Sequence, residues 1–137
     1  MSRFGDSQNY RFESATALAA VVLMLRGTPY LYQGEEFGME NNDYQNISQL
    51  KDVESINYYQ ILKQKGYEVS AILKILSARS RDNAQTPMQW NNKQFSGFSS
   101  HQPWINVNTN YLRVNWEKDY HSPQSIFNSI TQKKFSL

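Results

Sequence analysis

The sequence predicts an α/β fold, because one long helix is followed almost directly by a buried strand. The Ala-, Leu- and Met-rich run Tyr10–Arg26 predicts a helix that is apolar nearly all round between Ala15 and Leu25, and we expect it to be buried on most sides. Gly27 stands where a helix C-terminal glycine is common. The β-prone run Thr28–Gln33 shows no polar alternation, which indicates a strand covered on both faces, as in a parallel sheet. No other stretch predicts a comparably buried strand, so the partner strands of this sheet are missing.

The composition excludes several classes of function. The chain has 137 residues, a formal net charge of +2 and no cysteine. Balanced charge predicts neither a nucleic-acid footprint nor a membrane-surface patch, and the lack of cysteine excludes disulfides, thiolate zinc sites and cysteine nucleophiles. The apolar run is too short to span a bilayer and no signal-peptide pattern opens the chain, so we expect a cytoplasmic protein. Aromatic residues reach 14%, many beside Asn, Gln and Asp, a composition typical of sugar sites and also of turn-rich surfaces.

Two further helices are predicted in the middle of the chain. After an amide-rich loop over Glu40–Lys51, the spacing of apolar residues predicts a helix over Val53–Gln64 and another over Glu68–Ser80. The first should turn Ile56, Tyr59 and Leu62 inward, and the second Val69, Ile72, Leu73, Ile75 and Leu76.

The last third of the chain shows little periodicity. Arg81–Tyr111 is rich in Asn, Gln, Pro and Trp, which indicates an ordered functional loop, since linkers rarely carry Trp. The tail from His121 is too short and too polar to form a core.

Few residues are candidates for chemistry. Glu35 and Glu36 follow the predicted strand at its carboxyl end, the edge where parallel α/β folds place their sites, although a cap or a salt bridge would use the same residues. Arg81 can pair with a carboxylate while donating to a ligand hydroxyl, or can simply hold its loop by backbone contacts. His101 and His121 stand apart from other ligand-type residues, so neither a metal nor another cofactor is expected.

Five segments in one order carry a family resemblance. The segments SRFGDSQNYRFESA, GTPYLYQGEEFGM, DVESINYY, SRDNAQTPMQW and PWINVNTNY resemble the α-glucosidases of glycoside hydrolase family 13, in the group of oligo-1,6-glucosidase, dextran glucosidase and trehalose-6-phosphate hydrolase. The resemblance implies a (β/α)8 barrel that cleaves α-glucosidic bonds with retention, by a nucleophilic carboxylate, a glutamic acid and a stabilising aspartate. All three would lie upstream of this chain, so no residue here is expected to be catalytic.

The resemblance gives the chain a place and its residues roles. It implies that residues 1–127 are a C-terminal fragment of the barrel, with the seventh helix at Tyr10–Arg26 and the eighth strand at Thr28–Gln33, which accounts for the missing sheet. Arg81 matches an arginine that pairs with an upstream aspartate and holds the non-reducing-end glucose. Glu54 matches a glutamate that binds the sugar beyond the scissile bond, and Glu35 and Glu36 match carboxylates that support the site.

The chain also departs from the family pattern. Gln85 and Lys51 stand where the family has arginine, and Met1 stands where valine is common. Residues 128–137 leave the pattern, so we expect an aberrant tail that is disordered or out of frame, from a broken or split gene.

The sequence thus predicts a fragment of an enzyme acting on small α-glucosides or trehalose 6-phosphate, inactive alone and without nucleic-acid or membrane partners. The alternatives are a non-catalytic sugar-binding or complementing module that works with the upstream barrel segment, and an independent small α/β domain.

Overall fold

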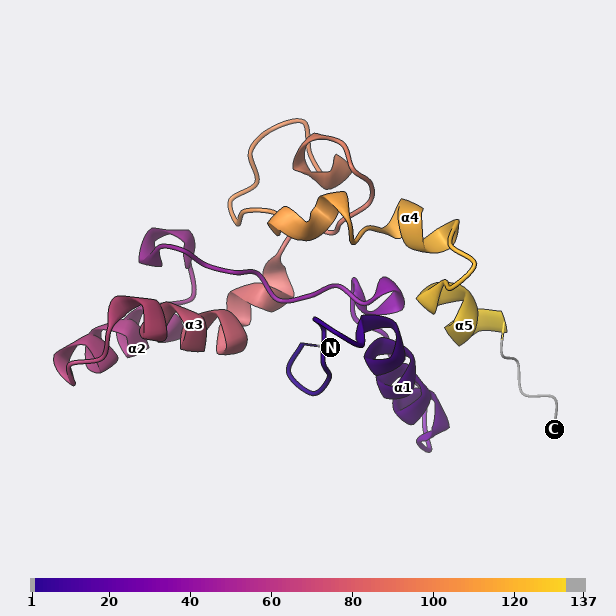
Figure 1. Ribbon diagram of the computed structural model, residues 1–137, viewed down its shortest axis with the longest axis horizontal. Coiled ribbons are helices and arrows are strands. Elements are labelled where there is room, and N and C mark those ends of the chain that lie inside the picture. Colours follow the sequence, from indigo (N-terminus) through magenta and orange to yellow (C-terminus); the bar gives the residue numbers. More distant parts are fainter. Residues whose placement is uncertain (1, 133–137) are drawn as a thin grey trace.

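The computed structural model describes residues 2–132, which form helices, short 3-10 turns and loops without a β-strand. The α-helices are α1 (Arg11–Met24), α2 (Val53–Gln64), α3 (Val69–Arg79), α4 (Trp116–Tyr120) and α5 (Ile126–Gln132). The 3-10 turns are η1 (Glu35–Phe37), η2 (Ile47–Gln49), η3 (Arg81–Gln85), η4 (Gln94–Gly97) and η5 (Thr109–Leu112). Figure 1 shows α2 and α3 side by side on the left, α1 and α5 on the right, and the long loop between α3 and α4 above them.

The α2–α3 pair is formed as the sequence predicts. Asp52 begins α2 by accepting hydrogen bonds from the N–H groups of its first turn, and Ser80 ends α3. The facing apolar side chains build one hydrophobic cluster of buried residues, which consists of Tyr44, Leu50, Tyr59, Leu62, Ile72, Leu73 and Leu76. Val69 and Ile75, which were predicted to face inward, are 44% and 40% exposed and lie outside this cluster.

The helix α1 is formed, but the prediction that it is buried on most sides is wrong for this chain. Only Ala15 and Ala19 are buried, whereas Met24 and Leu25 are 74% and 66% exposed. The run Thr28–Gln33 is likewise not a strand in the described structure. Both failures have one cause, since a strand needs neighbours for its backbone and an all-apolar helix needs cover on every side, and residues 2–132 supply neither.

The turn η1 and the C-terminal helix build a second core. Phe37, Met88 and Val114 form its buried cluster, and α5 packs against both α1 and η1. Ile126 is completely buried, so the tail from His121, predicted to be too short and too polar to form a core, adds an apolar side chain to a core built by other elements. The tail forms no core by itself, because α5 buries its apolar residues against η1 and α1.

The predicted aberrant tail, residues 128–137, is only partly described. Residues 128–132 belong to α5, and residues 133–137 lie outside the described range. Its reading frame stays a prediction.

The two ends of η1 require unusual backbone angles. Gly34 and Gly38 flank the turn with φ of 88° and 67°, in the left-handed region that favours glycine. A Cβ on Gly34 would lie 2.4 Å from Sδ of Met39, and one on Gly38 would lie 2.9 Å from Cδ1 of Ile126. The side chain of Arg11 fastens the turn to α1 by donating to the Phe37 carbonyl over 2.6 Å.

The loop between α3 and α4 contains the buried polar contacts that an ordered loop needs. Gln89 is fully buried, and its Nε2 donates to the Val114 carbonyl over 2.6 Å and to Asn110 Oδ1 over 2.9 Å. Ser96 is also fully buried and donates its hydroxyl to the Met88 carbonyl over 3.0 Å.

Candidate functional site

The structure brings together two of the residues that the sequence singled out. Nη2 of Arg81, at the start of η3, lies 3.3 Å from Oε2 of Glu54, in the first turn of α2. Both side chains remain largely exposed, at 76% and 70%, so their remaining hydrogen-bonding atoms are open to a ligand. Among residues 2–132 Arg81 therefore pairs with Glu54, and its predicted pairing with an upstream aspartate concerns a residue outside this chain.

The cap of α2 holds Glu54 in place. Asp52 accepts from the N–H groups of Glu54 and Ser55 over 3.3 and 3.2 Å, and from the Ser55 hydroxyl over 2.7 Å. Partial burial pushes the pKa of Asp52 upward, but the hydrogen bonds from Ser55 and the positive charge of Arg81 outweigh it and hold that pKa below its ordinary value.

The buried carboxylate of Asp82 joins η3 to the start of α2. Its Oδ2 accepts from the N–H groups of Lys51 over 2.6 Å and of Asp52 over 3.1 Å, and the residue is only 1% exposed. Beside it, Tyr44 is 2% exposed, and among residues 2–132 its hydroxyl has no partner at hydrogen-bonding geometry. Burial, and then the negative charge of Asp82, raise the pKa of Tyr44 above its ordinary value. Sequence reasoning missed Asp82, because a single acidic residue in an aperiodic loop gives no sign that it is buried.

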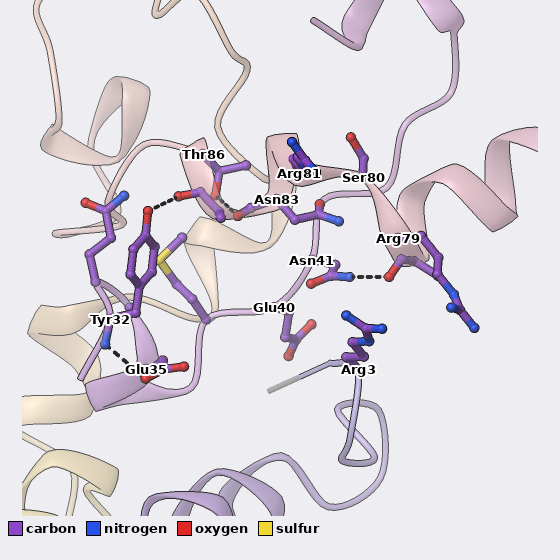
Figure 2. Close-up of a pocket in the computed structure, with 15 residues that line it drawn as sticks. Arg3, Tyr32, Glu35, Glu40, Asn41, Arg79, Ser80, Arg81, Asn83 and Thr86 are labelled. Carbon is purple, nitrogen blue, oxygen red and sulfur yellow. Dashed lines mark hydrogen bonds between the residues drawn. The ribbon is translucent and has the colours of Figure 1, made fainter. Parts of the chain in front are cut away.

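Two cavities meet at Arg81. The first, of about 320 Å³, lies between η1, the segment after it and the end of α3, as Figure 2 shows. Its lining includes Arg3, Tyr32, Glu35, Glu40, Asn41, Arg79, Arg81, Asn83 and Thr86. The second, of about 640 Å³, is lined by Glu54 together with Arg3, Asp52, Tyr58, Arg79 and Arg81 among others. Guanidinium, carboxylate and amide groups around an aromatic ring can hold a polyhydroxylated ligand by many directed hydrogen bonds.

The paired glutamates after the predicted strand behave differently from each other. Glu35 lines the first cavity, and its Oε2 accepts from the N–H of Tyr32 over 2.9 Å. The hydroxyl of Tyr32 in turn donates to the Ala84 carbonyl over 2.9 Å, which connects η1 to η3 across the cavity (Figure 2). Glu36 is half-buried and is not among the residues that line this cavity. The geometry therefore gives Glu35 a place in the cavity wall and gives Glu36 none.

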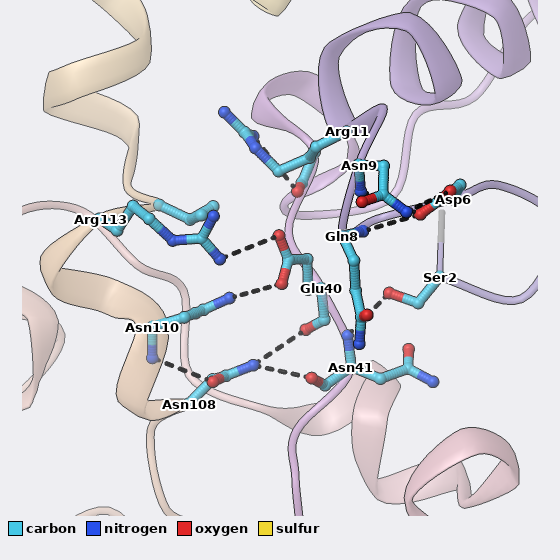
Figure 3. Close-up of polar contacts among 12 residues, drawn as sticks. Ser2, Asp6, Gln8, Asn9, Arg11, Glu40, Asn41, Asn108, Asn110 and Arg113 are labelled. Atoms are coloured by element: carbon cyan, nitrogen blue, oxygen red, sulfur yellow. Dashed lines mark hydrogen bonds and ion pairs between the residues drawn. The ribbon is translucent and has the colours of Figure 1, made fainter.

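A polar clamp, formed by Glu40, Asn108, Asn110 and Arg113, joins the end of the long loop to the segment after η1 (Figure 3). Oε2 of Glu40 accepts from Nδ2 of Asn110 over 3.1 Å, and Oε1 lies 3.7 Å from Nη2 of Arg113, an ion pair too long to count as a hydrogen bond. Nδ2 of Asn108 donates to the carbonyl of Asn41 over 2.8 Å. The clamp ties the end of the long loop to the cavity wall, and sequence reasoning missed it because its members lie about 70 positions apart.

The remaining sequence candidates stay outside this site. His101 pairs with the hydroxyl of Ser100 over 2.9 Å, and the ring of His121 stacks edge-on against Tyr120. Within residues 2–132 no group of three or more His, Asp and Glu side chains is arranged to hold a metal ion. In that same range no helix is both long enough and apolar enough to cross a membrane.

Comparisons of the whole chain with known proteins identify one enzyme family and several relatives. A family model described as alpha amylase, catalytic domain, matches residues 1–135. The chain is 44% identical over 129 residues to the probable oligo-1,6-glucosidase 2 of Bacillus subtilis (strain 168), which covers 93% of this chain and 23% of that protein. It is 46% identical over 127 residues to the trehalose-6-phosphate hydrolase of the same strain, and this match covers 93% of this chain and 23% of that protein.

A solved structure shows the same arrangement in three dimensions. The crystal structure of Bacillus licheniformis trehalose-6-phosphate hydrolase matches with a TM-score of 0.89 and 49% identity, over 94% of this chain and 23% of that chain. The predicted fold class, part of a (β/α)8 barrel that is mostly helix and loop by itself, is confirmed. The chain spans 23% of the length of the curated relatives named above.

Proposed function

Because this chain belongs to the alpha-amylase catalytic-domain family, we propose that it is the C-terminal part of the barrel of a retaining α-glucosidase. The predicted resemblance to glycoside hydrolase family 13 is confirmed by the family match and by the named oligo-1,6-glucosidase and trehalose-6-phosphate hydrolase relatives. In the proposal the assembled enzyme hydrolyses α-glucosidic bonds of small oligosaccharides or of trehalose 6-phosphate, in the cytoplasm. The three catalytic carboxylates of such an enzyme are assigned to none of the residues of this chain.

The single observation that carries the proposal is the Arg81–Glu54 pair at the edge of two cavities. Its geometry supports a shared sugar-binding role, since the two side chains lie 3.3 Å apart and both remain exposed. We assign Arg81 to the non-reducing-end glucose and Glu54 to the sugar beyond the scissile bond. Glu35 would support the site from the wall of the first cavity, whereas for Glu36, which does not line that cavity, the supporting role rests on the family resemblance alone.

A second function, a non-catalytic module that binds sugar or complements an upstream segment, has its own supporting observation. The end of α1 and the segment after it expose a run of large apolar side chains, from Met24 at 74% to Tyr30 at 84%. Monomeric proteins rarely expose such contiguous apolar patches, so a partner surface fits this region. The upstream barrel segment would supply both the apolar cover and the strand edges.

The test combines this chain with the missing part of a relative. Residues 1–137 are mixed with the N-terminal three quarters of the B. subtilis trehalose-6-phosphate hydrolase, and hydrolysis of 4-nitrophenyl α-glucoside is followed. We expect no turnover from either part alone and clear turnover from the pair. Turnover by this chain alone would refute the assignment of the catalytic carboxylates to an upstream segment.

Two variants of this chain sharpen the test. Arg81→Lys removes the planar fork of donors and should lower kcat/KM of the pair by about tenfold or more, the effect of losing roughly one good hydrogen bond. Lys63→Arg is the charge-conserving control, since Lys63 is exposed and lines neither cavity. A pair that associates but shows no turnover at all supports the non-catalytic module instead.

A further inference from the structure

The carboxylate of Asp82 connects the two proposed sugar-binding residues through the backbone. Asp82 follows Arg81 directly in η3, and its Oδ2 accepts from the N–H groups of Lys51 and Asp52 over 2.6 and 3.1 Å. Those two donors stand immediately before α2, whose first turn carries Glu54. One carboxylate oxygen therefore fixes the distance between the segment of Arg81 and the segment of Glu54.

A second buried contact runs parallel to the first. Oγ of Ser80 accepts from the N–H of Asp82 over 3.2 Å and lies 3.0 Å from Oγ of Ser55 in α2. Ser55 and Ser80 are 6% and 7% exposed, so water cannot easily compete for these hydrogen bonds. The start of α2 and the start of η3 are thus joined twice, and both joints are out of solvent.

The exposed ion pair itself cannot set this geometry. Arg81 and Glu54 are 76% and 70% exposed, and ion pairs in water contribute little because solvent screens them and long side chains lose entropy. Hydrogen bonds to a buried, charged acceptor are individually stronger than those between neutral groups, and leaving their donors unpaired is costly. Compared with the exposed ion pair and the single neutral contact between Ser55 and Ser80, the two charge-assisted hydrogen bonds to Asp82 therefore contribute most to where the guanidinium and the carboxylate meet.

We propose that Asp82 is a positioning residue, which holds Arg81 and Glu54 at a fixed separation so that one sugar-binding surface spans both cavities. This inference rests on the proposed function, in which those two residues contact adjacent sugars. Asp82 itself is buried and lines neither cavity. Its loss lets η3 and α2 separate, so Arg81 and Glu54 no longer bind neighbouring sugars together.

The separation can be measured without any enzymatic activity, because the chain contains no cysteine. In the full chain, Arg81→Cys and Glu54→Cys are made together and labelled with pyrene maleimide, whose excimer emission reports proximity. This replacement also removes the ion pair, so the proximity that remains comes from the scaffold. Adding Asp82→Ala should lower the excimer-to-monomer ratio about threefold or more, whereas the exposed control Asp43→Asn should leave it unchanged. An unchanged ratio in a folded Asp82→Ala chain overturns the proposal.

A second variant decides the matter if Asp82→Ala does not fold, as judged by circular dichroism. Asp82→Asn keeps the volume but replaces one acceptor oxygen with a donor and removes the charge. The amide protons of Lys51 and Asp52 should then exchange several-fold faster, with a smaller fall in the excimer ratio. Asp82→Asn with unchanged exchange and unchanged ratio overturns the proposal.

Activity in the combined enzyme separates this inference from the proposed function. If the wild-type pair hydrolyses 4-nitrophenyl α-glucoside, Asp82→Asn should raise KM by about tenfold while kcat falls less, as expected when binding rather than chemistry is impaired. A fall in kcat alone contradicts a positioning role. If the wild-type pair is inactive, the proposed function fails, and the excimer and exchange results still decide the role of Asp82.

Discussion

Removing the carboxylate of Asp119 should destabilise the chain by about 3 kcal/mol. This side chain, at the end of α4, is 6% exposed and begins α5 by accepting three hydrogen bonds at 2.9–3.1 Å. The donors are the Ser125 hydroxyl and the N–H groups of Ile126 and Phe127. Each such bond contributes roughly 1 kcal/mol net, and Asp119→Ala leaves the N–H of the fully buried Ile126 without an acceptor.

Urea unfolding followed by tryptophan fluorescence measures this loss. The ring of Trp116 lies 4.7 Å from that of Phe127 in α5, so separation of α4 and α5 changes its surroundings. Glu117→Ala is the matched control, because Glu117 is exposed on the same helix and should change the free energy of unfolding by less than about 0.5 kcal/mol. A loss below about 1 kcal/mol for Asp119→Ala would show that the reasoning about buried acceptors is wrong here.

Three further changes probe the cap, the buried phenol and the turn before the cavity. Asp52→Ala removes the cap of α2 and should lower the free energy of unfolding by about 1 kcal/mol at pH 7. Because the folded pKa of Asp52 is lowered, the contribution of its charge is complete above the unfolded pKa and disappears as pH falls through the folded pKa. The difference in the free energy of unfolding between the wild type and Asp52→Ala, measured with urea, should therefore shrink as the pH is lowered; a difference that stays constant contradicts the charge argument. Tyr44→Phe removes a buried hydroxyl that has no hydrogen-bond partner among residues 2–132, and should raise the free energy of unfolding by about 1 kcal/mol; a decrease would reveal a partner. Gly34→Ala should lower the thermal midpoint of unfolding more than Gly66→Ala. The two glycines have similar φ angles, 88° and 82°, but of the two only Gly34 has atoms within 4 Å of the new Cβ. Equal decreases would mean that the neighbouring Met39 side chain moves aside.

The sequence predicted well those elements whose partners lie within the chain. The bounds of α2 agree with the prediction at both ends, because Asp52 supplies the cap and Tyr59 and Leu62 meet α3 a short loop away. Arg81 and Glu54 were singled out separately, and the structure brings them together at the second cavity, although their roles stay a prediction. Periodicity and caps are local signals, and for α2 and α3 local signals were enough.

What the sequence did not reveal are buried polar groups. Asp82 and Asp119 are 1% and 6% exposed, yet each stands in a stretch whose composition predicts solvent exposure. Their burial depends on backbone donors brought by other segments, and the donors to Asp82 lie some 30 positions earlier in the chain. Hydrophobic periodicity cannot detect a carboxylate that is satisfied by backbone N–H groups, because the pattern records side chains alone.

The location of the hydrogen-bond partners also explains why the region around Arg81 and Glu54 differs from the segment after α1. Arg81, Glu54 and their buried supports have their hydrogen-bond partners within residues 2–132, so this half of the site can keep its geometry in the isolated chain. The segment after α1 differs, because within the described range residues 27–31 take part in no backbone hydrogen bond and Tyr30 is 84% exposed. The backbone N–H and C=O groups of an apolar, β-prone segment form hydrogen bonds with a neighbouring strand. Here that strand would have to come from a further chain or segment. The part of the chain that carries Arg81 and Glu54 should therefore keep its geometry without a partner, whereas the segment after α1 should gain backbone hydrogen bonds only when a partner strand is present.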